Sequence, residues 1–100
     1  MKTNIPLEMQ KKFLTEDGFE PWPIPDDWLP TIEWLDETLE ALAPGYRIVQ
    51  IKEKFGRLRF YYQLPDETPI AVARAFRALI FQTEEAIRHE GTAEGNVLLY

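Results

Sequence analysis

The sequence contains no cysteine, no serine and a single histidine, and these absences limit its chemistry. Without cysteine the chain can form no disulfide and no thiolate metal site, which is compatible with a reducing cytosol. The seven threonines are scattered, and none neighbours a plausible base in the sequence. His89 lies near the expected end of a helix, where the helix dipole favours an exposed imidazole rather than a general base. We therefore predict no catalytic residue and no enzymatic activity.

Long hydrophobic runs are also missing. No apolar run approaches the roughly 20 residues of a membrane-spanning helix, and the N-terminus lacks the apolar core of a signal peptide. There is no phosphate-binding glycine loop and no metal-ligand spacing. A magnesium site could be imagined among a set of carboxylates, but their spacing is that of a solvated, capped helix: Asp26, Asp27, Asp36, Glu37 and Glu40. We expect a cytoplasmic protein with no metal and no other cofactor.

Basic residues are few but concentrated. The net charge is −6, with 11 Lys and Arg against 17 Asp and Glu. Residues 1–45 carry three basic and ten acidic side chains, residues 46–64 five basic and one acidic, and residues 65–100 three basic and six acidic. Such segregation steers charged partners toward residues 46–64, although acidic helices could instead neutralise that segment within the fold.

Residues 46–64 give the strongest structural signal in the chain. Two runs rich in β-branched and aromatic residues flank Phe55-Gly56, which predicts a β-hairpin with a two-residue turn. The predicted register forms a mostly apolar face from three pairs: Ile51 with Phe60, Val49 with Tyr62, and Glu53 with Leu58. The other face pairs Lys54 with Arg57, Lys52 with Arg59 and Gln50 with Tyr61. Like charges directly opposite each other destabilise a strand pair, so this face requires a nearby anion.

Residues 50–61 also carry a resemblance to a known group. Their sequence resembles the Lys-Glu-Lys-Phe-Gly-x-Leu-Arg-Phe-Tyr signature of small, uncharacterised phage and prophage proteins. Asp17-Gly18-Phe19 and the following helix resemble the Asp-Gly-Trp and helix of that group, so the likeness spans roughly residues 17–75, and only the hairpin is specific. Many members carry a Cys-x-x-Cys pair suggestive of a metal site, and this chain has none. The resemblance implies a fold and a phage-like origin, and no activity.

Two helices and two shorter elements are expected around the hairpin. Residues 26–43 carry an apolar stripe of Trp28, Ile32, Leu35, Leu39 and Leu42. Residues 68–90 form a second helix whose apolar face comprises Val72, Ala73, Phe76, Leu79, Ile80, Thr83 and Ile87. Residues 96–100 are expected to add a short strand to the hairpin edge or to plug the core. We predict a small single α+β domain, residues 1–100, in which both helices pack on the Val49, Ile51, Phe60 and Tyr62 face.

Residues 1–25 comprise a short helix and a proline-rich connector. The helix is expected to run to about Thr15, with Ile5, Met9 and Phe13 on one face. The connector is either a recognition segment or a structural link in which Phe19, Trp22 and Ile24 close the core, and we favour the link.

The functional hypothesis is binding without catalysis. A phage-like accessory protein would bind a protein partner and occlude or inhibit it through an exposed surface comprising Lys52, Lys54, Arg57, Arg59, Tyr61 and Trp34. Trp34 lies off the apolar stripe and is either covered by the N-terminal segment or exposed. The alternative is nucleic-acid binding, because the basic face of the hairpin can contact phosphates and stack a base, although the pI near 4.7 is unusual for that class. A dimer through the same face is also compatible with the pattern.

Overall fold

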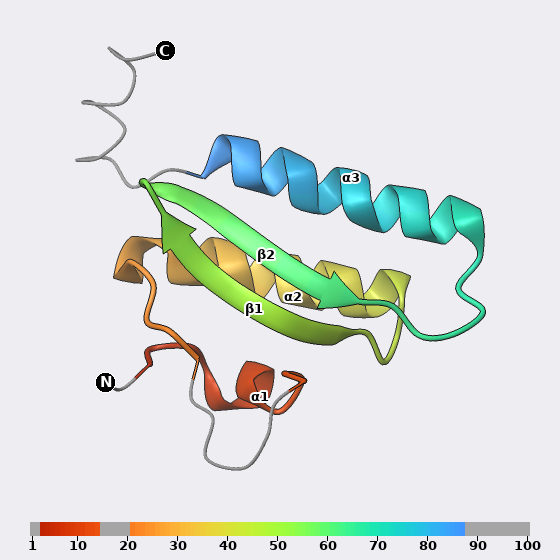
Figure 1. Ribbon diagram of the computed structural model, residues 1–100, viewed down its shortest axis with the longest axis horizontal. Coiled ribbons are helices and arrows are strands. Elements are labelled where there is room, and N and C mark those ends of the chain that lie inside the picture. The colour runs from red at the N-terminus through yellow and green to blue at the C-terminus, as the bar shows by residue number, and fades with distance from the viewer. Residues whose placement is uncertain (1–2, 15–20, 88–100) are drawn as a thin grey trace.

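The computed structural model describes residues 3–14 and 21–87 (Figure 1). The elements in chain order are α1 (Leu7–Gln10), the short 3₁₀ helix η1 (Asp26–Trp28), α2 (Leu29–Leu42), β1 (Arg47–Lys54), β2 (Arg57–Gln63) and α3 (Ile70–Ala86). The strands form a two-stranded antiparallel hairpin. One face of the hairpin lies on α2, α3 runs along the β2 side, and α1 lies beyond β1 (Figure 1). This is the small α+β domain that the sequence predicts.

The predicted turn is confirmed. Phe55 and Gly56 both have positive φ, 56° and 79°, as the twist of a two-residue hairpin requires. Glycine adopts this conformation freely, whereas Phe55 adopts it at a steric cost. The Phe55 side chain is 76% exposed. The register confirms five predicted pairs, namely Gln50 with Tyr61, Ile51 with Phe60, Lys52 with Arg59, Glu53 with Leu58 and Lys54 with Arg57.

The predicted pairing of Val49 with Tyr62 is wrong, because a β-bulge interrupts the ladder. The register passes directly from Gln50–Tyr61 to Ile48–Tyr62, which leaves Val49 as the extra residue. Ile48 is fully buried and Val49 is 43% exposed. A bulge shifts the alternation of side chains by one residue, so Ile48 takes the core position that strict alternation gives to Val49.

The core lies between the inner face of the hairpin and the two long helices. The hairpin buries Ile48, Ile51, Leu58 and Phe60. The predicted helical faces supply most of the rest, with Trp28, Ile32, Leu35 and Leu39 from the first helical segment and Phe76, Ile80 and Thr83 from α3. The Phe76 ring joins the layers, since it lies 5.1 Å from the Tyr46 ring and 4.7 Å from the Tyr62 ring between centroids.

The N-terminal segment covers part of the β1 edge. Ile5, Met9 and Phe13, which are predicted to share one face, are all buried. However, α1 ends at Gln10, well before Thr15, because the chain becomes extended and Phe13 forms a parallel bridge with Ile48. The Ile48 amide donates to the Lys12 carbonyl at 3.0 Å, and the Leu14 amide donates to the Ile48 carbonyl at 2.8 Å. These bonds satisfy the outward backbone groups of β1 at the bulge.

The connector and the C-terminal helix differ in part from the prediction. Ile24 is buried, but Trp22 is 58% exposed and does not close the core; Phe19 lies outside the described residues. The second long helix ends at Ala86 instead of near Glu90, and Ile87 is extended and only 9% exposed. The local sequence has no stop signal before Gly91, so packing of Ile87 sets the end of α3. The predicted strand 96–100 lies outside the described residues.

Within the part of the chain that the structure describes, no helix combines the length and the apolar character needed to cross a membrane.

The bulged register makes a testable prediction about burial. Ile51→Asp or Phe60→Asp should abolish the cooperative thermal melt, because each would bury a charge without a partner. Val49→Asp places the same charge in the same strand but on the exposed bulge, so its free energy of unfolding should change by less than about 0.5 kcal/mol. A wild-type melt for Ile51→Asp, or equal losses for Ile51→Asp and Val49→Asp, would contradict this register.

Candidate binding surface

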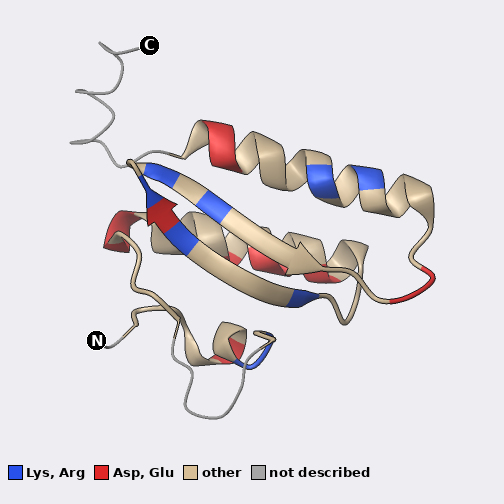
Figure 2. Cartoon of the chain, in the orientation of Figure 1, with Lys and Arg blue, Asp and Glu red and all other residues tan. Residues whose placement is uncertain are grey.

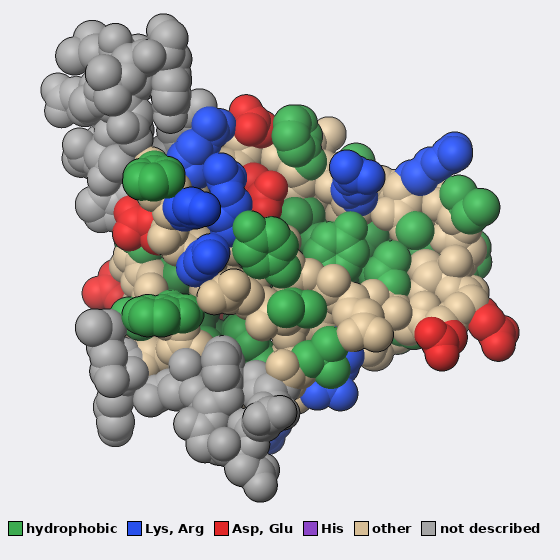
Figure 3. All heavy atoms as spheres, in the orientation of Figure 1, with side chains coloured by type: hydrophobic (Ala, Val, Ile, Leu, Met, Phe, Trp, Pro, Cys, Tyr) green, Lys and Arg blue, Asp and Glu red, His purple; other side chains and the backbone are tan. Residues whose placement is uncertain are grey.

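The outer face of the hairpin presents most of the residues predicted to bind a partner. We call Lys52, Lys54, Arg57, Arg59 and Tyr61 the cationic face. The four basic residues form two neighbouring cross-strand pairs, and Tyr61 follows on β2 opposite Gln50. Basic residues concentrate on both strands at the turn end of the hairpin (Figure 2). Their side chains gather on the side of the molecule turned away from α2, with hydrophobic side chains beside them (Figure 3).

Aromatic rings accompany the cations of this face. The Lys52 Nζ lies 6.0 Å from the centroid of the Tyr61 ring, and the Lys54 Nζ lies 6.0 Å from that of Phe55. These distances are at the outer limit of a cation–π interaction. Tyr61 is 45% exposed. The face therefore combines positive charge with accessible ring surface.

Among the described residues, the anion required by the like-charge pairs is present for Arg57. Arg57 Nη2 lies 3.1 Å from Glu85 Oε2 of α3. Arg59 Nη1 donates to the backbone carbonyl of Leu58 at 3.3 Å. Among residues 3–14 and 21–87, no carboxylate lies within ion-pair distance of Lys52, Lys54 or Arg59. Within residues 3–14 and 21–87, the fold thus neutralises Arg57 and leaves three positive charges without a carboxylate partner.

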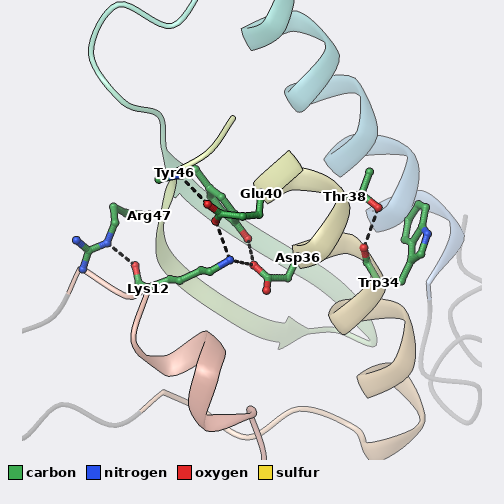
Figure 4. Close-up of polar contacts among 8 residues, drawn as sticks. Lys12, Trp34, Asp36, Thr38, Glu40, Tyr46 and Arg47 are labelled. Atoms are coloured by element: carbon green, nitrogen blue, oxygen red, sulfur yellow. Dashed lines mark hydrogen bonds and ion pairs between the residues drawn. The ribbon is translucent and has the colours of Figure 1, made fainter. Parts of the chain in front are cut away.

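Trp34 belongs to a different surface. It is 51% exposed, so the N-terminal segment does not bury it. One step along a helix from the buried Leu35 turns its side chain by roughly 100° away from the core. Figure 4 shows Trp34 beside Thr38, on the side of α2 opposite Asp36 and Glu40. The structure therefore brings five of the predicted binding residues together and leaves Trp34 apart.

Two hollows flank the cationic face, and the sequence prediction did not identify either one. On the β1 side, a hollow of about 420 Å³ is lined by Trp22, Pro23, Gln50, Lys52 and Glu53. On the β2 side, a groove of about 350 Å³ is lined by Phe60, Tyr61, Tyr62, Arg77, Ile80, Phe81 and Glu84. The only sequence signal for the groove is the position of Phe81 off the apolar face of its helix; Phe81 is 60% exposed.

A second polar cluster joins three segments of the chain (Figure 4). Lys12 Nζ donates to Asp36 Oδ1 at 2.7 Å and to Glu40 Oε1 at 2.8 Å. The Tyr46 hydroxyl donates to the same Asp36 oxygen at 2.7 Å, and the Gly45 amide donates to Glu40 Oε2 at 2.8 Å. We call Lys12, Asp36, Glu40 and Tyr46 the Lys12 network. Two carboxylates of the set considered for magnesium therefore bind a lysine ammonium.

The Lys12 network fixes the protonation states of its members. Burial alone would lower the pKa of Lys12, but the hydrogen bonds and charges of Asp36 and Glu40 together raise it. The hydrogen bond from Lys12 lowers the pKa of Glu40 against the opposing effect of burial. Burial, and then the hydrogen bond to Asp36, raise the pKa of Tyr46. At neutral pH the ammonium, the Glu40 carboxylate and the phenol are therefore locked in forms that suit a structural contact.

Comparison of the chain with protein-family models, with curated proteins and with solved structures finds no match. The resemblance of the hairpin to phage and prophage proteins therefore stays a prediction.

Removing the cation of the Lys12 network should destabilise the fold. Lys12→Met would leave Asp36, whose side chain is only 14% exposed, without its ammonium partner. We expect a loss of about 2 kcal/mol in the free energy of unfolding, between the values for exposed and buried ion pairs. Lys11→Met is the matched control, because Lys11 contacts Glu8 at 3.6 Å with both side chains largely exposed. Equal effects of the two variants in urea titrations would contradict a structural role of the network.

Because the pKa of Glu40 is lowered, the contribution of Glu40 to the stability of the fold depends on pH. A carboxyl group whose pKa is lower in the folded state stabilises the fold above its ordinary value of 4.5, and the effect is lost as pH falls through the folded value. Glu40→Gln should therefore be less stable than wild type at pH 7, and the gap should close as the pH falls below 4.5 through the lowered pKa of Glu40. Urea midpoints across this range measure it. A gap that stays constant would show that the Glu40 charge is not responsible.

Proposed function

We propose that this protein is a non-enzymatic binding protein whose cationic face docks on an acidic surface of a protein partner. The observation that carries the proposal is the pair of Lys52 and Arg59, which face each other across the hairpin with no carboxylate of the described residues within ion-pair distance. Such a pair destabilises the free hairpin. A partner carboxylate placed between the two cations would remove that repulsion in the complex, which favours binding.

The contacts of the other charged residues support the proposal, because those residues have partners within the fold. Glu85 neutralises Arg57, Glu84 accepts the Phe60 amide, and Asp36 and Glu40 bind Lys12. These carboxylates of α2 and α3 thus have partners within the fold. Lys52, Lys54 and Arg59, in contrast, are not paired with a carboxylate of the described residues. Given the phage-like hairpin sequence, the corresponding biological role is occlusion or inhibition of a host protein.

Nucleic-acid binding is the second candidate, and a specific observation favours it. The exposed Tyr61 ring lies beside Lys52, so one base could stack while its phosphate contacts the ammonium group. The three cations act over a screening length of roughly 8 Å. A long polyanion extends beyond that distance, where the net charge of −6 opposes its binding. We therefore favour a partner with a short acidic segment.

A symmetric dimer through the cationic face is less favourable. Twofold symmetry places the same patch of both copies in contact, so Lys52 and Arg59 of one copy would meet the same cations of the other.

Charge reversal on the cationic face should separate binding from folding. The double variant Lys52→Glu/Arg59→Glu is not suitable for this test, because it replaces one like-charge pair across the strands with another. The single variant Lys52→Glu instead creates an opposite-charge pair. We expect Lys52→Glu to match or exceed the thermal stability of wild type while losing its protein partner.

The measurement is affinity capture from nuclease-treated bacterial lysate, with mass spectrometry of the retained proteins. Arg74→Glu makes the same charge change at an exposed position of α3 and is the matched control. Proteins retained by wild type and Arg74→Glu but lost with Lys52→Glu would support the proposal. Retention that is equal for all three baits would contradict it, as would a clear loss of stability in Lys52→Glu.

The nucleic-acid alternative has its own signature. Binding of a labelled oligo-dT to the purified protein should weaken with salt by a slope near −0.7 for each phosphate neutralised on a single strand. Tight, salt-sensitive binding that Lys52→Glu abolishes would replace the protein partner with a nucleic acid.

A further inference from the structure

The groove between β2 and α3 opens directly beside the cationic face. Phe60 and Ile80 are 2% and 4% exposed and belong to the core, whereas Tyr61 and Phe81 present exposed rings from opposite sides of the groove. Arg59 precedes Tyr61 by two residues and so projects from the same face of β2. An occupant of the groove would therefore lie within reach of the cations of the hairpin.

The groove has room for one large side chain. Its volume of about 350 Å³ lies near the lower end of the range for small-molecule sites. The groove is open to solvent, so water lies beside its aromatic and aliphatic walls. Replacing this water with one large apolar side chain would bury the exposed ring surface of Tyr61 and Phe81, which is favourable.

Charges at the groove determine which part of a partner can enter. Glu84 lies in its wall, and its Oε2 accepts the Phe60 amide at 2.9 Å. This carboxylate repels an acidic group from the interior, and it also occupies a backbone donor that an added β-strand would need. Arg77, on the same helix, is not paired with any carboxylate of the described residues. The interior therefore suits an apolar group, and Arg77 and Arg59 suit acidic groups around it.

We infer that the groove binds one large apolar side chain of an acidic peptide segment, whose flanking carboxylates contact Arg77, Arg59 and Lys52. The inference rests on the proposed function, since it takes the partner of the cationic face to be a protein. It specifies that partner further as a segment with an apolar anchor between acidic residues. The anchor enters as a side chain, without addition of a strand to β2.

The inference can be tested with a library of random nonapeptides displayed on bacterial cells. Cells that bind the purified, labelled protein are selected, and their peptides are sequenced. The expected result is enrichment of peptides that carry a large aliphatic or aromatic residue with Asp or Glu on either side. In a labelled selected peptide, replacing the apolar residue with serine should weaken binding about tenfold or more.

Variants of the groove then locate the anchor. Phe81→Ser and Arg77→Glu should each weaken the selected peptide about tenfold, and Phe81→Leu should retain most of the affinity because it keeps an apolar wall. Ile70→Ser removes a similarly exposed apolar side chain from the start of α3, and Trp34→Ser removes an exposed aromatic from α2. Both controls should bind within about twofold of wild type. Amide shifts in heteronuclear NMR spectra on titration should concentrate at residues 59–62 and 77–84.

The outcomes separate this inference from the proposed function. Acidic peptides selected without an apolar residue, lost with Lys52→Glu but unaffected by Phe81→Ser, would overturn the groove and leave the proposed function standing. A library that yields no binder, or only basic peptides, would overturn both. Oligo-dT binding that Phe81→Ser abolishes, in the absence of peptide binding, would assign the groove to a base and overturn the peptide anchor.

Discussion

The ion pairs of Lys12 hold together the parts of this structure that are far apart in the sequence. The ammonium group binds two carboxylates of α2, and the carbonyl of the same residue accepts the Ile48 amide of β1. A helix as short as α1 is not stable alone, so its position depends on such tertiary contacts. Because the Lys12 side chain is partly buried, the network is favourable only while all of its hydrogen bonds are made. The Lys12 network also holds the N-terminal segment against β1, so that this segment hydrogen-bonds the strand edge at the bulge.

The remaining edge and face of the hairpin follow from how the helices are placed. With α2 beneath the sheet and α3 along β2, Glu84 and Glu85 reach the Phe60 amide and the Arg57 guanidinium. Neither helix crosses the outer face of the hairpin (Figure 1). The same arrangement that satisfies the Phe60 amide therefore leaves Lys52, Lys54 and Arg59 on the face that neither helix covers, and it forms the groove beside them. The cationic face and the groove are consequences of one packing geometry.

Features governed by local chemistry could be predicted from the sequence. The Phe55-Gly56 turn fixed five pairs of the register, and alternation of side chains correctly grouped Lys52, Lys54, Arg57, Arg59 and Tyr61. Alternation failed at Val49, because a bulge changes which side chains face the core and no residue type marks it. The ends of α1 and α3 depend on the packing of Phe13 and Ile87, which is a tertiary effect. The groove requires Tyr61 and Phe81 to meet across two elements, and periodicity within either element cannot show that contact.

The contrast between total and local charge restricts the partners that this surface can select. At a distance, a chain of net charge −6 repels any extended polyanion. Within a screening length of roughly 8 Å, an approaching group experiences mainly Lys52, Lys54 and Arg59. A short acidic segment gains the local attraction and largely escapes the distant repulsion, whereas a long nucleic acid experiences both. An apolar side chain in the adjacent groove would add affinity that salt does not screen, and it would distinguish one acidic segment from another.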